Sequence, residues 1–217
     1  MRATGLLAGL AIAGCSTAVR QSSTGHMGAA TPADGRLSPA AIARADSGRP
    51  PYTRADVRFM QGMIGHHAQA ILMAGWAPSH GASPSVRTLA ERIVVAQRDE
   101  IATMQRWLGD RRETVPDADA SHDMMPGMDH STLMPGMLTA EQLRQLDAAR
   151  GADFDRLFLT FMIQHHQGAV TMVKQLFSTN GAAQDEDIFK FSADVNVDQM
   201  TEIDRMTLML QALPSSK

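Results

Sequence analysis

Apolar residues recur every three or four positions in the first half of the chain, and this spacing predicts two helices. The first begins at Thr53, which forms a capping box with Asp56, and ends near Gly75. The second begins at Ser83, an N-cap residue followed by proline, and ends at Gly109. The apolar positions of the second helix are Leu89, Ile93, Val94, Ile101, Met104 and Leu108.

The second half of the chain predicts helices of the same kind. A helical pattern begins at Thr139, where Gln142 completes another capping box, and continues to Ser178. One helix of that length is unusual in a globular domain, so we expect a break near Gly151 that leaves a short helix before a long one. The last predicted helix covers residues 185–210.

The two halves are copies of one pattern. The motif Phe-x3-Met-x2-His-His-x2-Ala-x2-Met occupies residues 59–73 and recurs at residues 158–172, with an Asp three residues before each Phe. The following helices also match, with Gln-x2-Glu-Ile-x2-Met at 97–104 and at 199–206. Each half is therefore a helical hairpin that cannot bury its apolar face alone. An all-α fold follows, in which two hairpins pair as a four-helix bundle.

A segment rich in Met and His separates the two hairpins. Residues 110–138 contain the tetrapeptide Met-Pro-Gly-Met twice, and its Pro and Gly exclude a regular helix. The expected organisation is thus a bundle over residues 52–212, with unit one at 52–109, the linker at 110–138 and unit two at 139–212. We expect the methionines of the linker to be exposed in a flexible loop.

The N-terminus has the features of a bacterial lipoprotein signal. Arg2 precedes a short apolar run, and the run closes on Ile-Ala-Gly followed by Cys15. We expect cleavage after residue 14 and lipidation of Cys15, the only cysteine of the chain. Residues 15–51 are rich in small and polar residues and predict a flexible tether. The protein would then be exported and anchored to a bacterial membrane, facing the periplasm or the cell exterior.

Composition narrows the choice of partners. The net charge is −3 and no basic stripe with interleaved aromatic residues is present, so nucleic acid is not an expected partner. A single cysteine excludes an internal disulfide and any cysteine-based zinc, haem or redox motif. Methionine is abundant at 16 residues, although methionine also fills irregular cores.

The repeated motif places soft and imidazole ligands on one helical face. Met63, His66 and Met73 share a face of the first helix, and the equivalent residues of unit two share a face of theirs. The second His of each pair lies about 100° further round, so one ring points inward and the other toward a neighbouring helix. Two interpretations stay open: a metal site, or a polar layer in which Glu100 and Glu202 satisfy buried histidines.

Thioether and imidazole together suit copper, with Cu(I) held by Met and Cu(II) by His. Calcium and magnesium need oxygen ligands, and a di-iron site needs more carboxylates than this pattern supplies. The linker offers a second set of copper ligands, which would capture or deliver the ion. This loop set is His122, Met124, Met125, Met128, His130, Met134 and Met137.

These motifs resemble the bacterial family called domain of unknown function 305 over roughly residues 52–212. The resemblance implies a ferritin-like helical bundle, usually exported, and some relatives are associated with periplasmic copper binding and copper tolerance. The family pattern falls on Met63, His66, His67, Met73, Glu100, Met104, Met162, His165, His166, Met172, Glu202 and Met206. Unit two departs from unit one at Met209, which stands where unit one has Trp107.

We therefore expect a membrane-tethered protein that binds copper and sequesters it or exchanges it with a copper donor or acceptor protein. Two alternatives remain. One is a ferritin-like oxidase that uses iron or manganese, and the other is a periplasmic interaction module without metal. Because no nucleophile–base arrangement is visible and no organic cofactor motif is present, a binding protein is favoured over an enzyme.

Overall fold

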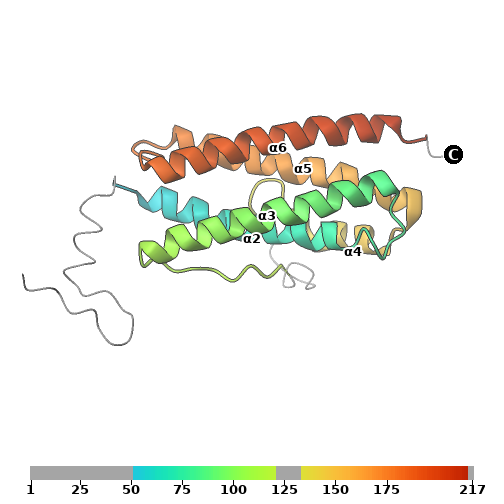
Figure 1. Ribbon diagram of the computed structural model, residues 1–217, viewed down its shortest axis with the longest axis horizontal. Helices are drawn as coiled ribbons and strands as arrows, with labels where there is room; N and C mark the ends of the chain where they lie inside the picture. Colours follow the sequence, from blue (N-terminus) through green and yellow to red (C-terminus); the bar gives the residue numbers. More distant parts are fainter. Residues whose placement is uncertain (1–50, 121–132, 215–217) are drawn as a thin grey trace, which may run out of the picture. The chain divides into compact units, whose positions relative to one another are not determined.

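The computed structural model describes residues 51–120 and 133–214, which contain five helices and no strand (Figure 1). The all-α prediction is confirmed. The helices are α2 (Arg54–Gly75), α3 (Pro84–Asp110), α4 (Ala140–Ala148), α5 (Gly151–Ser178) and α6 (Glu186–Ala212). The signal, the tether and six of the predicted functional residues lie outside the described ranges: Cys15, His122, Met124, Met125, Met128 and His130.

The helix ends follow the local signals in the sequence. Thr53 and Thr139 form the two predicted capping boxes, and Ser83 caps α3 ahead of a proline. The predicted break falls between α4 and α5, where Gly151 adopts a φ of +57° and its N–H donates to the carbonyl oxygen of His80. That backbone conformation favours glycine, which explains why the long helical pattern divides there.

The long helices form two hairpins that meet along their first helices. α2 packs along α3, α5 packs along α6, and α2 contacts α5. α3 and α6 make at most marginal contact with each other. The short helix α4 lies against α2 and α5. One side of the α2–α5 contact is therefore covered by α4 and the segment before it, while the α3–α6 side is not closed by helix packing.

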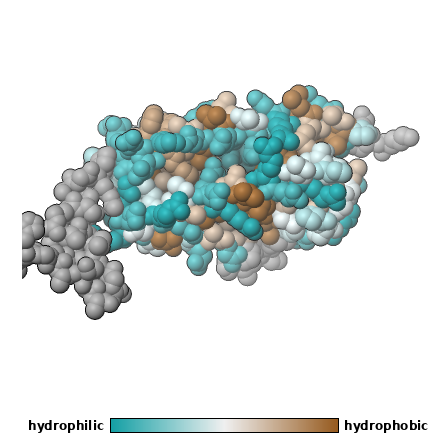
Figure 2. Space-filling view, in the orientation of Figure 1, coloured by the Kyte–Doolittle hydropathy of each residue, from teal (hydrophilic) through white to brown (hydrophobic). Residues whose placement is uncertain are grey.

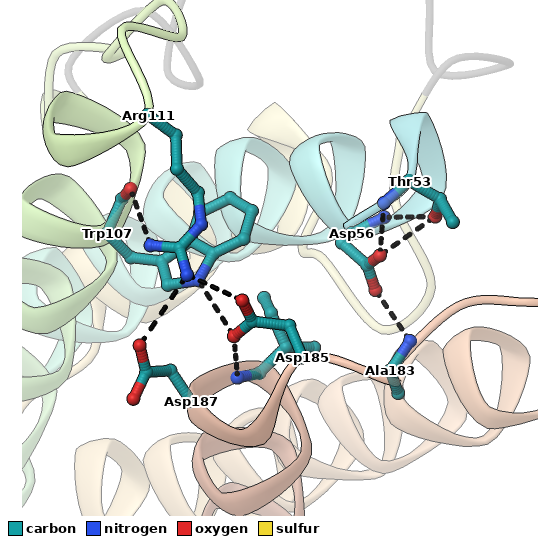
Figure 3. Close-up of polar contacts among 8 residues, drawn as sticks. Thr53, Asp56, Trp107, Arg111, Ala183, Asp185 and Asp187 are labelled. Carbon is teal, nitrogen blue, oxygen red and sulfur yellow. Dashed lines mark hydrogen bonds and ion pairs between the residues drawn. The ribbon is translucent and has the colours of Figure 1, made fainter. Parts of the chain in front are cut away.

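Two equivalent carboxylates tie each hairpin to the other. Asp56, near the start of α2, accepts a hydrogen bond from the backbone N–H of Ala183 at 2.7 Å, just before α6 (Figure 3). Asp155, near the start of α5, accepts from the backbone N–H of Ser83 at 3.1 Å, just before α3. Both carboxylates are buried. We predicted a capping role for Asp56, and the structure adds a link between the hairpins at both positions.

An ion pair that the sequence did not reveal joins the end of α3 to the start of α6. Arg111 lies 2.6 Å from Asp185, and both side chains are buried (Figure 3). The guanidinium also stacks on Trp107, 4.2 Å from the ring centroid. Asp185 caps α6 through the N–H of Ile188, so one carboxylate serves both the helix end and the ion pair.

Hydrophilic residues cover much of the face seen in Figure 2. Across residues 51–120 and 133–214, none of the helices combines the length and the apolar character that a membrane span requires.

Candidate metal centre

The four histidines of the repeated motif converge where α2 meets α5. We call His66, His67, His165 and His166 the imidazole row. All four side chains are fully buried. The rings of His66 and His165 lie at the centre with their centroids 3.8 Å apart, one from each hairpin. His67 and His166 flank them, with ring centroids 6.4 Å and 6.2 Å from their neighbours. The predicted division into inward and outward rings is therefore observed.

Each outer imidazole faces a glutamate of the second helix in its own hairpin. The Nε2 atom of His67 lies 2.7 Å from the carboxylate of Glu100, although the contact falls outside hydrogen-bond alignment. The Nε2 atom of His166 is hydrogen bonded to Glu202 at 2.6 Å. The two glutamate side chains are 17% and 23% exposed, so they connect a buried row to the surface.

A short segment, residues 133–138, closes the other side of the row, and we call it the strap. The ring Nε2 of His66 donates to the carbonyl oxygen of Pro135 at 3.0 Å. The side-chain amide of Gln69 exchanges two hydrogen bonds with the backbone of Leu138. Gly168 allows the closest approach, because a Cβ at that position would lie 1.9 Å from the carbonyl oxygen of Pro135.

Several ring nitrogens of the row have no hydrogen-bond partner within the part of the chain that the structure describes. They are Nδ1 of His66 and His166, and both ring nitrogens of His67 and His165, with Nε2 of His67 in the misaligned contact with Glu100 described above. Because Nε2 of His66 carries the proton donated to Pro135, a neutral ring leaves the lone pair on Nδ1. The same reasoning applies to His166, whose Nε2 faces a carboxylate. The row thus holds buried lone pairs that nothing in the described chain uses.

Burial keeps the central imidazoles neutral. Desolvation, together with repulsion from His67, lowers the pKa of His66 to about 3. Desolvation also lowers the pKa of His165 well below its usual value, helped by repulsion from His66. Neutral imidazole is the form that binds metals. The two central rings are therefore in the ligand form at ordinary pH.

The predicted methionines divide between the two ends of the core. Met63, Met104 and Met172 belong to one buried cluster, and Met73, Met162 and Met206 belong to the other. Each cluster therefore combines thioethers from both hairpins, on either side of the row. All six are buried, which equally suits ordinary core packing. Met209, which stands where unit one has Trp107, lies partly buried against the second of these clusters.

The strap methionines correct one expectation. We predicted that Met134 and Met137 are exposed, but Met137 is buried and Met134 is half-buried against the α2–α5 core. The reason is the turn at Gly136, with φ of +76°, which folds the segment back onto the helices. Met134 Sδ would lie 2.9 Å from a Cβ placed on Gly62.

Sequence reasoning missed the residues that hold the row in place. Gln69 and Gly168 stand at equivalent positions of the two repeats, and both position the strap. The two repeats differ at this position and at several others, so nothing in the sequence alone marked these two residues. Among the described side chains, no group of three or more His, Cys, Asp and Glu has the geometry of a metal site. A site here would need thioethers or small shifts of the rings.

A protein family model and several solved structures are similar to this chain. The family model described as "Domain of unknown function (DUF305)" matches residues 56–210. A crystal structure of a DUF305 fragment from Deinococcus radiodurans is 29% identical with a TM-score of 0.64, covering 76% of this chain and 100% of that one. The structure of CopM in the Cu(II)-bound form is 32% identical with a TM-score of 0.57, covering 72% of this chain and 95% of that one. CopM has also been solved in Cu(I)-bound and Ag-bound forms.

An uncharacterized protein of Acanthamoeba polyphaga mimivirus is 35% identical over 57 residues, which are 26% of this chain and 38% of that protein. This chain thus matches well under half of the length of that relative. The family model, in contrast, spans both helical hairpins and the imidazole row. The chain therefore belongs to the family of the domain of unknown function DUF305.

Proposed function

We propose that the protein binds copper through the imidazole row and the methionines beside it, and that it sequesters the ion or exchanges it with a partner protein. The observation that carries this proposal is the set of buried ring nitrogens without partners. Burying polar atoms unpaired costs about 1–3 kcal/mol for each group. A metal ion that accepts these lone pairs would remove the cost. The relationship to CopM, solved with Cu(II), Cu(I) and Ag, supports the same ion class.

The residues divide into ligands and supports. Nδ1 atoms of the row, with thioethers such as Met63 and Met162, would supply soft and borderline ligands, the set that copper prefers. Glu100 and Glu202 would orient the outer rings through Nε2, as carboxylates do behind metal-bound histidines. The strap holds His66 in the same way through Pro135.

The proposal extends to the parts of the chain that flank the hairpins. The four long helices would form a bundle of the ferritin-like type around the row. Lipidation of Cys15 would tether the protein to a bacterial membrane on its outer side. The Met and His residues of the linker would form a second, weaker copper site that passes the ion to or from a donor or acceptor protein.

Metal titration tests the proposal. Purified protein should bind Cu(II), and also Cu(I) under reducing conditions, with a dissociation constant below about 1 μM. Replacing all four histidines of the row by Ala should abolish that binding. His80→Ala is the matched control, because His80 is also buried but has hydrogen-bond partners on both ring nitrogens. Tight binding that survives the quadruple change, in protein shown to be helical by circular dichroism, would refute the role of the row.

A further inference from the structure

The strap closes one side of the imidazole row, and a surface groove lies on the opposite side. The strap covers the α2–α5 side, where Gly168 and Pro135 leave no room between backbones. On the opposite side α3 and α6 scarcely touch. A cavity of about 480 Å³ lies there, which we call the α3–α6 groove. It is lined by residues of both helices, from Asp99 to Arg111 and from Asp187 to Asp198.

The groove is rich in negative charge. Six carboxylates line it against three cationic side chains. Two of those cations are already paired, since Arg111 contacts Asp185 and Lys190 contacts Asp194. Burial raises the pKa of Asp198, and repulsion from Glu100, Asp194 and Glu202 adds to the effect. Carboxylates that repel one another in this way attract cations from solution.

The groove leads to a buried base. Glu100 lines the groove and lies 2.7 Å from Nε2 of His67, whose side chain is fully buried. Neither ring nitrogen of His67 has a hydrogen-bond partner among the described residues. A buried imidazole whose Nδ1 has no partner among the described residues thus stands directly behind a groove carboxylate. The acidic cluster is therefore connected to groups that bind metal rather than merely being a solvated surface.

We propose that the α3–α6 groove is the path by which metal cations reach the imidazole row, with Asp198 attracting the ion and Glu100 receiving it beside His67. This inference rests on the proposed function, because it assumes that the row binds the ion. It goes beyond that function by assigning a direction of access and a positioning role to Asp198. The side chain of Asp198 acts on the rate of arrival and is not a ligand.

The rate of copper association tests the path. Stopped-flow mixing of the full chain with Cu(II) should quench tryptophan fluorescence, since Trp107 lines the groove. Asp198→Asn should slow association about fivefold at low ionic strength, from the Coulomb attraction lost by a divalent ion. The difference should shrink in 0.5 M salt. Dissociation, followed by a chelator chase, should keep its wild-type rate.

Asp204→Asn is the charge-matched control, because Asp204 is an exposed residue of α6 that lies outside the groove. It should leave the association rate close to that of the wild type. Equal slowing by both variants, no slowing by either, or faster dissociation from Asp198→Asn would overturn the inference. Absence of copper binding by the wild type would instead refute the proposed function itself.

A steric variant provides a second measurement. Thr103 lines the groove and its hydroxyl donates to the carbonyl oxygen of Asp99. Thr103→Phe should slow association and dissociation by the same factor and leave the affinity unchanged, as expected for a narrowed path. Thr171→Phe on α5 is the control, since Thr171 makes the same type of bond to Gln167 away from the groove. Unchanged rates for Thr103→Phe would count against the path.

Discussion

Two glycines meet the strap in different ways, and this difference predicts the effect of adding one methyl group. At Gly168 the new Cβ would overlap backbone atoms of Pro135 and Gly136. At Gly62 it would meet only the flexible end of Met134, at 2.9 Å from Sδ. Gly168→Ala should therefore displace the strap and destabilise the protein by about 1–3 kcal/mol. Urea unfolding measures this, and Gly62→Ala should be the milder change.

The central histidines predict how stability depends on pH. The unfolded chain binds a proton at His66 below about pH 6.5, whereas the folded chain does so only near pH 3. The free energy of unfolding therefore keeps its full value above pH 6.5. It decreases as the pH falls toward 3, because the unfolded chain then binds a proton at His66 that the folded chain does not bind. Each such His should contribute a slope of about 1.4 kcal/mol per pH unit in that window.

Urea unfolding between pH 7 and pH 4 measures the slope. Carboxylates also lose stabilising contacts in acid, so the comparison with a His66→Gln variant isolates the imidazole. The variant should show a shallower dependence than the wild type. Parallel curves for the two proteins would contradict a neutral, desolvated His66.

At the scale of the helices, two aspartates near the start of α5 have different roles. Asp153 is exposed, while Asp155 is buried and accepts from Ser83 at the start of α3. Asp155→Ala should cost about 1–3 kcal/mol of unfolding free energy, because it leaves the N–H of the half-buried Ser83 without its partner. Asp153→Ala should cost only the few tenths to 1 kcal/mol of a helix-dipole interaction. Thermal unfolding of both variants would reveal equal losses if the contact to α3 is unimportant.

The helix ends and the contacts between hairpins differ in how far the sequence could predict them. Helix ends at Thr53 and Thr139 were predictable because their caps are local. The pairing of hairpins followed from the repeat. The contact between Asp155 and Ser83 joins residues far apart in sequence, so the spacing of apolar residues could not predict it. The strap was predicted as an exposed loop because Pro and Gly indicate irregular backbone but not what that backbone packs against.

Within the candidate site, the roles of the rings followed from the 100° offset between adjacent histidines. What the sequence could not supply is the distance across the α2–α5 contact. Only the fold shows that His66 and His165 lie 3.8 Å apart, or that Pro135 fixes one of them. Gln69 looked like an ordinary polar residue of a helix until its partner Leu138 was known.

At the scale of the whole molecule, the row belongs to both hairpins at once. His66 comes from one hairpin and His165 from the other, so neither half contains a complete centre. A metal ion bound between them would link α2 to α5. Binding should therefore raise the melting temperature of the whole helical unit, by mass action on the folded state. Addition of a chelator should reverse the increase.

A double-mutant cycle distinguishes one shared centre from two independent ones. If the centre is shared, His66→Ala and His165→Ala should each weaken copper binding by a similar factor, and combining them should add little, because the first change has already dismantled the site. Independent sites, one for each hairpin, would instead give halved stoichiometry in each single variant and additive losses in the double variant. The pair His67→Ala and His166→Ala is the control for the coupling energy, since the structure gives no contact between these two rings across the row. Stronger coupling in the central pair than in the outer pair is the expected result, because the central rings lie with their centroids 3.8 Å apart and their planes tilted by 40°.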